Sequence, residues 1–379
     1  MGRGCYAGRW RTGVFLLKLA LASLMGFGDR PAVAQHIGSD IAALNLCLYG
    51  DCEARGAYAA DPYGFANPGT LASGVLPLLP HGAFVSHGFF RLNVGGIGLN
   101  IDSPSITISA DPWVFEVNVI YADGGGTARS LPGTDLSIYT RMVRLALGVD
   151  LARATLAIPG LSVGVLAGVP GTTSDLRLTG GGVTLVESHE DHELGLTIGA
   201  HWCRGTRDWF NAGAFLQVER HHESAQQFDP FTQTSTDQHG TSNAWFSRIG
   251  LSLLPFVPLG LTPSAPIAEL LSEIRVATDF EYRNISALGE PTNADEIGYF
   301  GLDARVLPDA WNPLSDYLRI YAITGIDTNA GWGAGAGLWG SGPIEFLSCN
   351  PAYSSRPLAT SLGNRVDVWA ATCAVAVSW

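Results

Sequence analysis

The sequence predicts an all-β fold, a transmembrane antiparallel β-barrel of about 14 strands with an N-terminal plug segment. Three observations predict it: a C-terminal segment that alternates strictly between two kinds of residue, an N-terminal export signal, and many apolar residues without a run long enough for a membrane helix. The chain is 46% hydrophobic and only 15% charged, and it contains 47 Gly. Such a composition favours short alternating segments over membrane-spanning helices.

The C-terminal segment, residues 365–379, has a strict period of two. Its odd-numbered residues from Trp369 to Trp379 are apolar, and the even-numbered residues between them are small or weakly polar. This period predicts a strand. The two Trp residues are separated by roughly 33 Å along a strand, and a tilt of about 45° projects this onto an apolar band about 25 Å tall. We therefore expect the two Trp side chains at the two membrane interfaces.

Residues 1–34 have the order of an export signal. Three arginines precede an apolar run at 14–27, and the small residues 32–34 follow it. This order predicts a signal peptide that is removed before Gln35. An N-terminal membrane helix is the alternative, but the uncharged part of about ten residues is too short to cross a bilayer. Export together with a barrel predicts the bacterial outer membrane as the location.

The charge of the exported chain excludes nucleic acid as a partner. Without residues 1–34, the chain keeps 17 of its 22 Lys and Arg and 33 of its 34 Asp and Glu, a net charge of −16. Binding to nucleic acid requires a basic surface. The expected partners are instead the lipid of the outer membrane and a hydrophobic small molecule.

Residues 35–80 lack the alternation of the rest and are predicted to form the plug, with the barrel at 81–379. Cys47 and Cys52 would form a small disulfide-closed loop in an oxidising compartment. Two unpaired thiols are the alternative, because the five cysteines after residue 34 leave at least one unpaired. No second Cys pair follows at a spacing suited to a metal, so no metal site is expected.

A motif in this segment resembles the N-terminal signature of FadL-type long-chain fatty acid and hydrocarbon transporters. It comprises the runs GAYAADP (56–62) and NPGTLA (67–72), with the plug residues Asp61, Pro62, Asn67, Pro68 and Leu71. Gly69 stands where that family usually has Ala. The resemblance implies a plugged outer-membrane barrel and passive uptake of an apolar solute. Two ordinary Pro-containing turns are the alternative.

From residue 83 onward the alternation keeps returning. In residues 273–283, for example, Val276, Phe280 and Tyr282 alternate with charged residues. A soluble sandwich would bury the apolar set and expose the polar one, whereas a membrane barrel exposes the apolar set to lipid. Length, aromatic placement and the export signal favour the barrel.

If the apolar faces point to lipid, a set of charged residues faces the lumen: Glu273, Arg275, Asp279, Glu281, Arg283, Asp303 and Arg305, and also Glu116, Glu219, Arg248 and Arg319. Both signs occur, so these side chains are expected to pair across strands and hold the wall rigid. Hydrogen bonding to the plug is a second role open to them.

Turn and loop signals sketch the topology. Residues 204–208 and 308–316 are predicted to be short periplasmic turns, and the polar stretches 123–133, 224–240, 284–295 and 340–364 are predicted to be external loops. Gly and Pro break the alternation between residues 151 and 188. Inward glycines at 331–337 would leave room for the plug inside the wall.

Signals for catalysis or metal binding are weak. The runs His189-Glu190-Asp191-His192 and His221-His222-Glu223 lack a third defined metal ligand, and His239 with Ser242 lacks an orienting partner for a lipolytic site. We therefore expect no enzyme and no cofactor. The predicted function is passive uptake of hydrophobic small molecules such as long-chain fatty acids or hydrocarbons; a general porin and a structural or secretion-associated barrel are the alternatives.

Overall fold

Fifteen strands and two α-helices make up the described part of the chain. The computed structural model describes residues 67–76, 80–94, 97–127, 134–154, 158–169, 172–180, 183–204, 209–229, 233–257, 266–286, 293–308, 311, 318–328, 332–340, 346–357 and 365–378. The predicted signal peptide, Cys47, Cys52, Asp61, Pro62 and Trp379 lie outside these residues.

The elements follow one another along the chain in the following order. The helices are α3 (Thr70–Val75) and α4 (Pro266–Ser272). The strands are β1 (His81–Val94), β2 (Ile97–Ala110), β3 (Trp113–Thr127), β4 (Thr134–Asp150), β5 (Leu161–Gly168), β6 (Thr172–Gly180), β7 (Val183–Arg204), β8 (Phe210–Asp229), β9 (Thr234–Leu253), β10 (Arg275–Ser286), β11 (Asn293–Arg305), β12 (Leu318–Asp327), β13 (Trp332–Gly340), β14 (Phe346–Pro357) and β15 (Arg365–Ser378).

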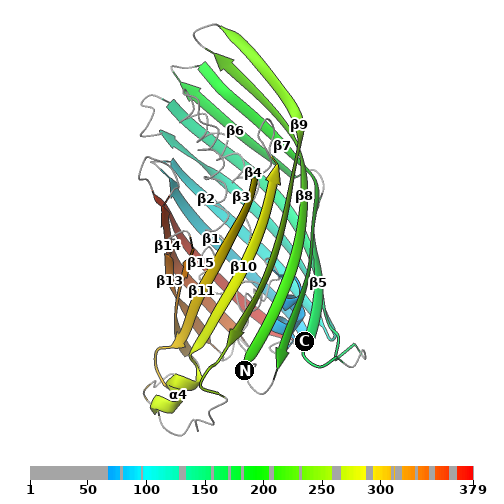
Figure 1. The fold of residues 1–379 in the computed structure, drawn as a ribbon, viewed down its shortest axis with the longest axis vertical. Helices are drawn as coiled ribbons and strands as arrows, with labels where there is room; N and C mark the ends of the chain where they lie inside the picture. Colours follow the sequence, from blue (N-terminus) through cyan, green and yellow to red (C-terminus); the bar gives the residue numbers. More distant parts are fainter. Residues whose placement is uncertain are drawn as a thin grey trace.

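The strands form one antiparallel wall whose pairings return to their starting point. From β3 the pairings run through β2 and β1 to β15, and then through β14 back along the chain to β7. Strand β7 pairs with β5 and β6, both of these pair with β4, and β4 pairs with β3. Figure 1 shows the tilted strands of this wall. We call the end where β1 begins and β15 ends, with Gly82 opposite Ser378, the lower end.

Two of the 15 strands share one place in the wall. Strand β5 pairs with the lower parts of β4 and β7, and β6 pairs with their upper parts. The break between them falls in the stretch 151–188 where Gly and Pro interrupt the alternation. The wall therefore has 14 strand positions, as the sequence predicts.

The wall is apolar outside and polar inside. Ile198, Ile249 and Phe300 are 57%, 60% and 54% exposed, whereas Glu116 and Ser252 are fully buried. These sets follow the parity of the sequence, since neighbouring residues of a strand point to opposite faces. A soluble sandwich would show the reverse distribution. The fold is therefore a transmembrane antiparallel β-barrel.

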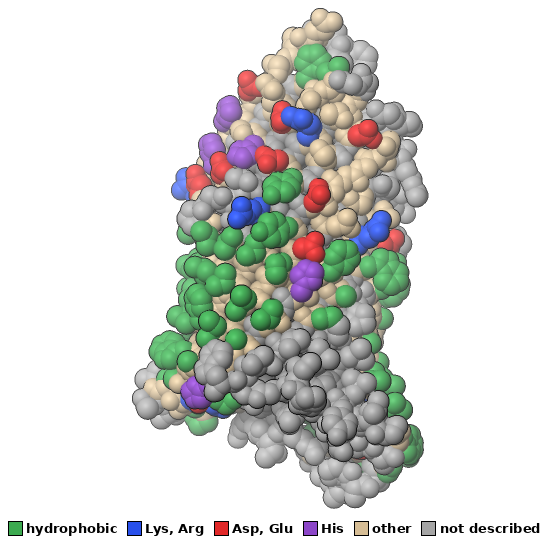
Figure 2. Space-filling view, turned by 180° about the vertical axis from the view of Figure 1, so that it is seen from behind, with side chains coloured by type: hydrophobic (Ala, Val, Ile, Leu, Met, Phe, Trp, Pro, Cys, Tyr) green, Lys and Arg blue, Asp and Glu red, His purple; other side chains and the backbone are tan. Residues whose placement is uncertain are grey.

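Aromatic side chains border the apolar outer band at both edges. At the upper edge Tyr353 contacts Trp332 and Trp369, with ring centroids 5.5 and 4.6 Å apart; at the lower edge Trp202 contacts Phe210 at 5.9 Å. Figure 2 shows hydrophobic side chains gathered below and charged and His side chains above them. Trp369, 61% exposed, lies in the upper aromatic border, as predicted for a residue at a membrane interface.

The upper part of the wall is uneven, and here two loop predictions are wrong. Strands β7, β8 and β9 have 22, 20 and 20 residues, against 10 in β12 and 9 in β13. The predicted loop at 224–240 is largely the upper parts of β8 and β9, and the predicted loop at 340–364 contains β14. The upper parts of β8 and β9 lie beyond the apolar band, where both faces of a strand meet water, so apolar alternation no longer marks them. Strand β14 starts at the lower end, where Phe346 lies opposite Ala376, and was missed because its sequence does not alternate and contains Pro351.

The connection from β9 to β10 contains α4, which the alternation does not predict. Pro266 begins the helix, where its missing N–H and fixed φ fit the first turn. The strand predicted from residue 273 begins instead at Arg275, because the N–H of Glu273 bonds to the carbonyl of Leu270 at the end of the helix. Among the described residues, no helix is long and apolar enough to cross a membrane.

A disulfide lies in the wall near the seam between β15 and β1. Cys373 is disulfide-bonded, and the residue opposite it on β14 is Cys349. Cys203 carries a thiol whose Sγ lies 3.6 Å from the carbonyl oxygen of Gly160. Cys349 therefore belongs to a strand rather than to the external loop predicted for it.

Replacing Cys349 with Ser is expected to release the thiol of Cys373 and to lower the free energy of unfolding by about 2–4 kcal/mol. A closed loop restricts the unfolded chain, and its loss removes that restriction. Thiol labelling in denaturant and urea unfolding in detergent measure the two effects. Cys203→Ser is the control, and a Cys373 that stays protected in Cys349→Ser would mean a different bonding partner.

Candidate functional site

The segment 67–76 is buried inside the barrel near its lower end. Asn67, Thr70, Leu71, Ala72 and Val75 are each fully buried, and α3 contacts β3, β4, β5 and β7. This segment contains the second half of the sequence motif. Its position makes it the candidate functional site.

Asn67 shapes the entry to α3. Its side-chain oxygen accepts a hydrogen bond from the N–H of Gly69 at 3.0 Å, and its carbonyl accepts one from the Thr70 hydroxyl at 2.7 Å. An Asn side chain that binds the backbone two residues on is a typical turn device. Its amide nitrogen donates to the carbonyl of Ala200 on β7 at 3.0 Å. One side chain therefore both forms the turn and joins it to the wall.

Three wall glycines make space for this turn. Gly148 on β4 lies opposite Gly164 on β5, which lies opposite Gly199 on β7; we call these three residues the glycine row. A Cβ on Gly164 would lie 2.0 Å from the carbonyl oxygen of Pro68, and one on Gly199 would lie 2.0 Å from Asn67 Oδ1. Both distances are far below van der Waals contact. The glycine row is therefore a seat shaped to residues 67–69.

Gly69 lies equally close to the backbone of the barrel wall. A Cβ at this position would lie 2.6 Å from Cα of Ala200. The close approach of two backbones excludes any larger residue. This explains why Gly stands where FadL-type transporters usually have Ala.

Polar and apolar contacts hold α3 above the seat. Ser73 Oγ lies 2.8 Å from His201 Nδ1 on β7, and it also donates to the carbonyl of Thr70 at 3.2 Å. A Cβ on Gly148 would lie 3.0 Å from Cβ of Leu71, so the helix packs directly on β4. Leu166 on β5 and Phe215 on β8 are buried apolar residues of the same region of the wall. The helix thus contacts the inner face of the wall through both polar and apolar side chains.

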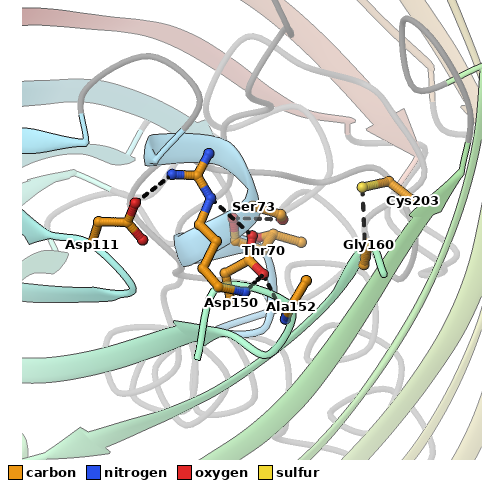
Figure 3. A network of polar contacts seen from close by, with 8 residues as sticks. Thr70, Ser73, Asp111, Asp150, Ala152, Gly160 and Cys203 are labelled. Carbon is orange, nitrogen blue, oxygen red and sulfur yellow. Dashed lines mark hydrogen bonds and ion pairs between the residues drawn. The ribbon is translucent and has the colours of Figure 1, made fainter. Parts of the chain in front are cut away.

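An ion-paired clasp at the lower end fixes the turns below α3. Arg153 contacts Asp111 at 2.8 Å and Asp150 at 3.5 Å, and Asp150 also accepts from the N–H of Ala152. Figure 3 shows this clasp beside Thr70 and Ser73. It joins the β2–β3 turn to the β4–β5 connection, and these segments adjoin β3, β4 and β5, three of the strands that α3 contacts.

Charged residues form a second polar cluster on the inner wall. Arg248 on β9 lies 2.9 Å from Asp279 and 3.2 Å from Glu281, both on β10. All three side chains are at most 7% exposed. Gly250 makes room for them, because a Cβ there would lie 1.4 Å from Asp279 Oδ1. We call these residues the Arg248 cluster.

Among the other residues predicted to face the lumen, Glu116 and Glu219 are buried, and the rest divide into three groups. Arg275 and Arg305 are buried; Arg275 donates to Ser252 Oγ at 3.3 Å, and Arg305 pairs with Glu269 of α4. Glu273 lies in the turn after α4 rather than on a strand. The side chains of Arg283, Asp303 and Arg319 lie outside the described part.

The His-containing run of β7 lies above the apolar band, outside the membrane-spanning part of the strand. His189 Nδ1 is 2.6 Å from Asp175 and its Nε2 is 3.3 Å from Asp191. The hydrogen bond to Asp175 raises the pKa of His189 above its ordinary value of 6.5, with support from the charge of Asp191 and against partial burial. This contact therefore stabilises the fold below about pH 6.5 and is lost as the pH rises through the raised pKa.

The described residues include no group of three or more His, Cys, Asp or Glu side chains that could hold a metal ion. His239 and Ser242, considered as a lipolytic pair, both lie on β9. They are three residues apart on one strand, so their side chains start from opposite faces of the wall.

The glycine row is what the sequence reasoning missed. Its members are 16 and 35 residues apart in the chain, and each looks like an ordinary strand glycine. The sequence signal that could have found them is their parity, because each glycine lies two residues from a side chain that is buried on the inner wall: Ala146 for Gly148, Ser162 for Gly164 and Thr197 for Gly199. The glycines chosen from the sequence, at 331–337, lie instead on and just before β13.

No protein-family model matches the chain, and the search of curated proteins finds no match. Similar solved structures include the CymD monoaromatic hydrocarbon channel, at 11% identity and a TM-score of 0.49 over 92% of this chain and 97% of that one. They also include the toluene transporter TbuX of Ralstonia pickettii, at 12% and 0.48 over 83% and 92%. A FadL homologue from Pseudomonas aeruginosa is similar at 11% and 0.45, again over 83% and 92%. At these identities and TM-scores, the solutes and activities of those proteins are not assigned to this chain.

Proposed function

We propose that this chain is a bacterial outer-membrane channel for the passive uptake of hydrophobic small molecules, with residues 35–80 as its plug. The observation that carries the proposal is the seat of residues 67–69 on the glycine row, inside a wall that is apolar outside. The close fit of residues 67–69 inside the lumen supports the proposal of a plug. The long extensions of β7, β8 and β9 above the apolar band favour an external location for the upper end and a periplasmic location for the lower end.

The class of solute is inferred from two features. The motif at 56–72 resembles that of FadL-type transporters, which implies an apolar solute such as a long-chain fatty acid or hydrocarbon. The inner wall also carries buried apolar residues beside its charges, among them Ile120, Phe215 and Phe246. An apolar solute would enter from outside, pass the plug and leave down its gradient.

Uptake tests this function directly. Bacterial cells that express the chain are expected to take up radiolabelled oleate or toluene faster than cells with an empty vector. Uptake of a small hydrophilic sugar is the control, because a general porin would accelerate it as well. Equal rates with and without the chain for both hydrophobic solutes would contradict the proposal.

Deleting residues 35–80 is expected to convert a closed barrel into an ion-conducting one, because the lumen loses the segment seated on the glycine row. Single-channel recording in a planar bilayer measures this as large, stable current steps that the full chain lacks. Heat-modifiable migration on gels checks that the shortened barrel is folded. Unchanged conductance in a folded, inserted variant would contradict the plug assignment.

A further inference from the structure

Two arginines lie on the outer wall at the upper edge of the apolar band. Arg91 on β1 is opposite Trp369 of β15, and Arg141 on β4 is opposite Tyr121 of β3. Both arginines are exposed, and Trp369 and Tyr121 are 61% and 39% exposed. Each arginine therefore lies opposite an aromatic residue of the neighbouring strand, at the level where lipid headgroups begin.

Arg141 is held in place by its aromatic neighbour. Its guanidinium carbon lies 6.0 Å from the ring centroid of Tyr121, within the range of a cation–π contact. Below it on the same face of β4, Leu145 and Leu147 are 38% and 39% exposed and belong to the apolar band. A lipid whose acyl chains cover these residues would bring its headgroup to Arg141.

These two arginines differ from the outward arginines higher on the wall. Arg177 is paired with Glu187 at 2.7 Å, and Arg220 with Glu193 at 2.9 Å. Among the described residues, no carboxylate lies within 4.0 Å of the Arg91 or Arg141 guanidinium. The acidic residues nearest in register are Asp102 and Asp367 for Arg91, and Asp123 and Asp175 for Arg141. Three of them have other partners: Asp102 contacts His87 at 3.1 Å, Asp175 contacts His189 at 2.6 Å, and Asp367 accepts hydrogen bonds from Tyr353 and Ser355.

We propose that Arg91 and Arg141 bind the phosphate groups of anionic lipids in the outer leaflet. A guanidinium donates two parallel hydrogen bonds to a phosphate, which is a match of geometry as well as charge. The position at the edge of the apolar band selects a membrane lipid over a free anion, because the acyl chains and the headgroup are bound together. This inference rests on the barrel and on the proposed periplasmic location of its lower end, but not on the solute, so failure of uptake would leave it standing.

Native mass spectrometry of the mature chain in a neutral detergent tests this inference. Equal amounts of phosphatidylglycerol and phosphatidylcholine with the same acyl chains are added, and the lipids that remain bound are counted. The unmodified chain is expected to prefer phosphatidylglycerol. Arg91→Gln and Arg141→Gln are each expected to lower that preference about fivefold, the usual contribution of one arginine near an anionic surface. The double variant is expected to lower it further, because it loses both contributions.

Arg177→Gln with Arg220→Gln is the matched control, because it removes the same charge from the same outer wall but from arginines that already have carboxylate partners. It is expected to leave the preference unchanged. Inorganic phosphate at the lipid concentration is expected not to displace the lipid. No preference in the unmodified chain, an equal loss in the control, or displacement by inorganic phosphate would each overturn the proposal.

Discussion

Gly164→Ala and Gly199→Ala are each expected to turn a silent channel into one that conducts ions. The added methyl group would lie 2.0 Å from the carbonyl oxygen of Pro68 or from Asn67 Oδ1. Overpacking of this kind costs about 1–3 kcal/mol, and such a cost shifts an equilibrium between two states about 5- to 150-fold. This cost destabilises the state in which residues 67–69 pack on the glycine row, because the strand itself tolerates Ala.

Single-channel recording measures the open fraction of each variant in a planar bilayer. Gly98→Ala is the matched control: this glycine also lies on a strand, but a Cβ there would meet nothing within 4 Å. It is expected to behave like the unmodified chain. If Gly164→Ala and Gly199→Ala stay silent while the deletion of 35–80 conducts, the plug acts without the seat, and the glycine row is not what holds it.

Arg248→Met is expected to lower the free energy of unfolding by about 3–5 kcal/mol, the usual result of removing one partner from a buried ion pair. The change leaves the carboxylates of Asp279 and Glu281 on the inner wall without the guanidinium that lies 2.9 and 3.2 Å from them. Their side chains are 0% and 7% exposed, so water compensates poorly. Urea unfolding in lipid vesicles, followed by tryptophan fluorescence, measures the loss.

Two further variants test whether burial or charge alone causes the loss of stability in Arg248→Met. Arg177→Gln removes an arginine from an ion pair that is about half exposed, and it is expected to cost at most about 1 kcal/mol. Adding Asp279→Asn and Glu281→Gln to Arg248→Met is expected to recover much of the loss, since none of the three charges of the Arg248 cluster then remains. A loss for Arg248→Met no larger than that for Arg177→Gln would contradict the role of the Arg248 cluster.

Alternation in the sequence was enough to assign the faces of the membrane-spanning strands. Charged residues such as Glu116 and Asp279 are buried on the inner wall, and Val276 and Phe280 on the outer wall are exposed, as their parity predicts. Prediction from alternation failed where a strand does not have one face toward lipid and one toward the lumen. Above the apolar band neither face of β8 or β9 meets lipid, and in α4 the period is no longer two, so both were missed.

The sequence by itself determined the kind of wall, because a strand in lipid must show an apolar residue at every second position. Only the tertiary structure decided which residues meet across that wall. The register between neighbouring strands aligns Gly148, Gly164 and Gly199, places Cys349 opposite Cys373, and brings Arg248 to Asp279. Register depends on backbone pairing between distant segments. A pattern within a single strand carries no information about it.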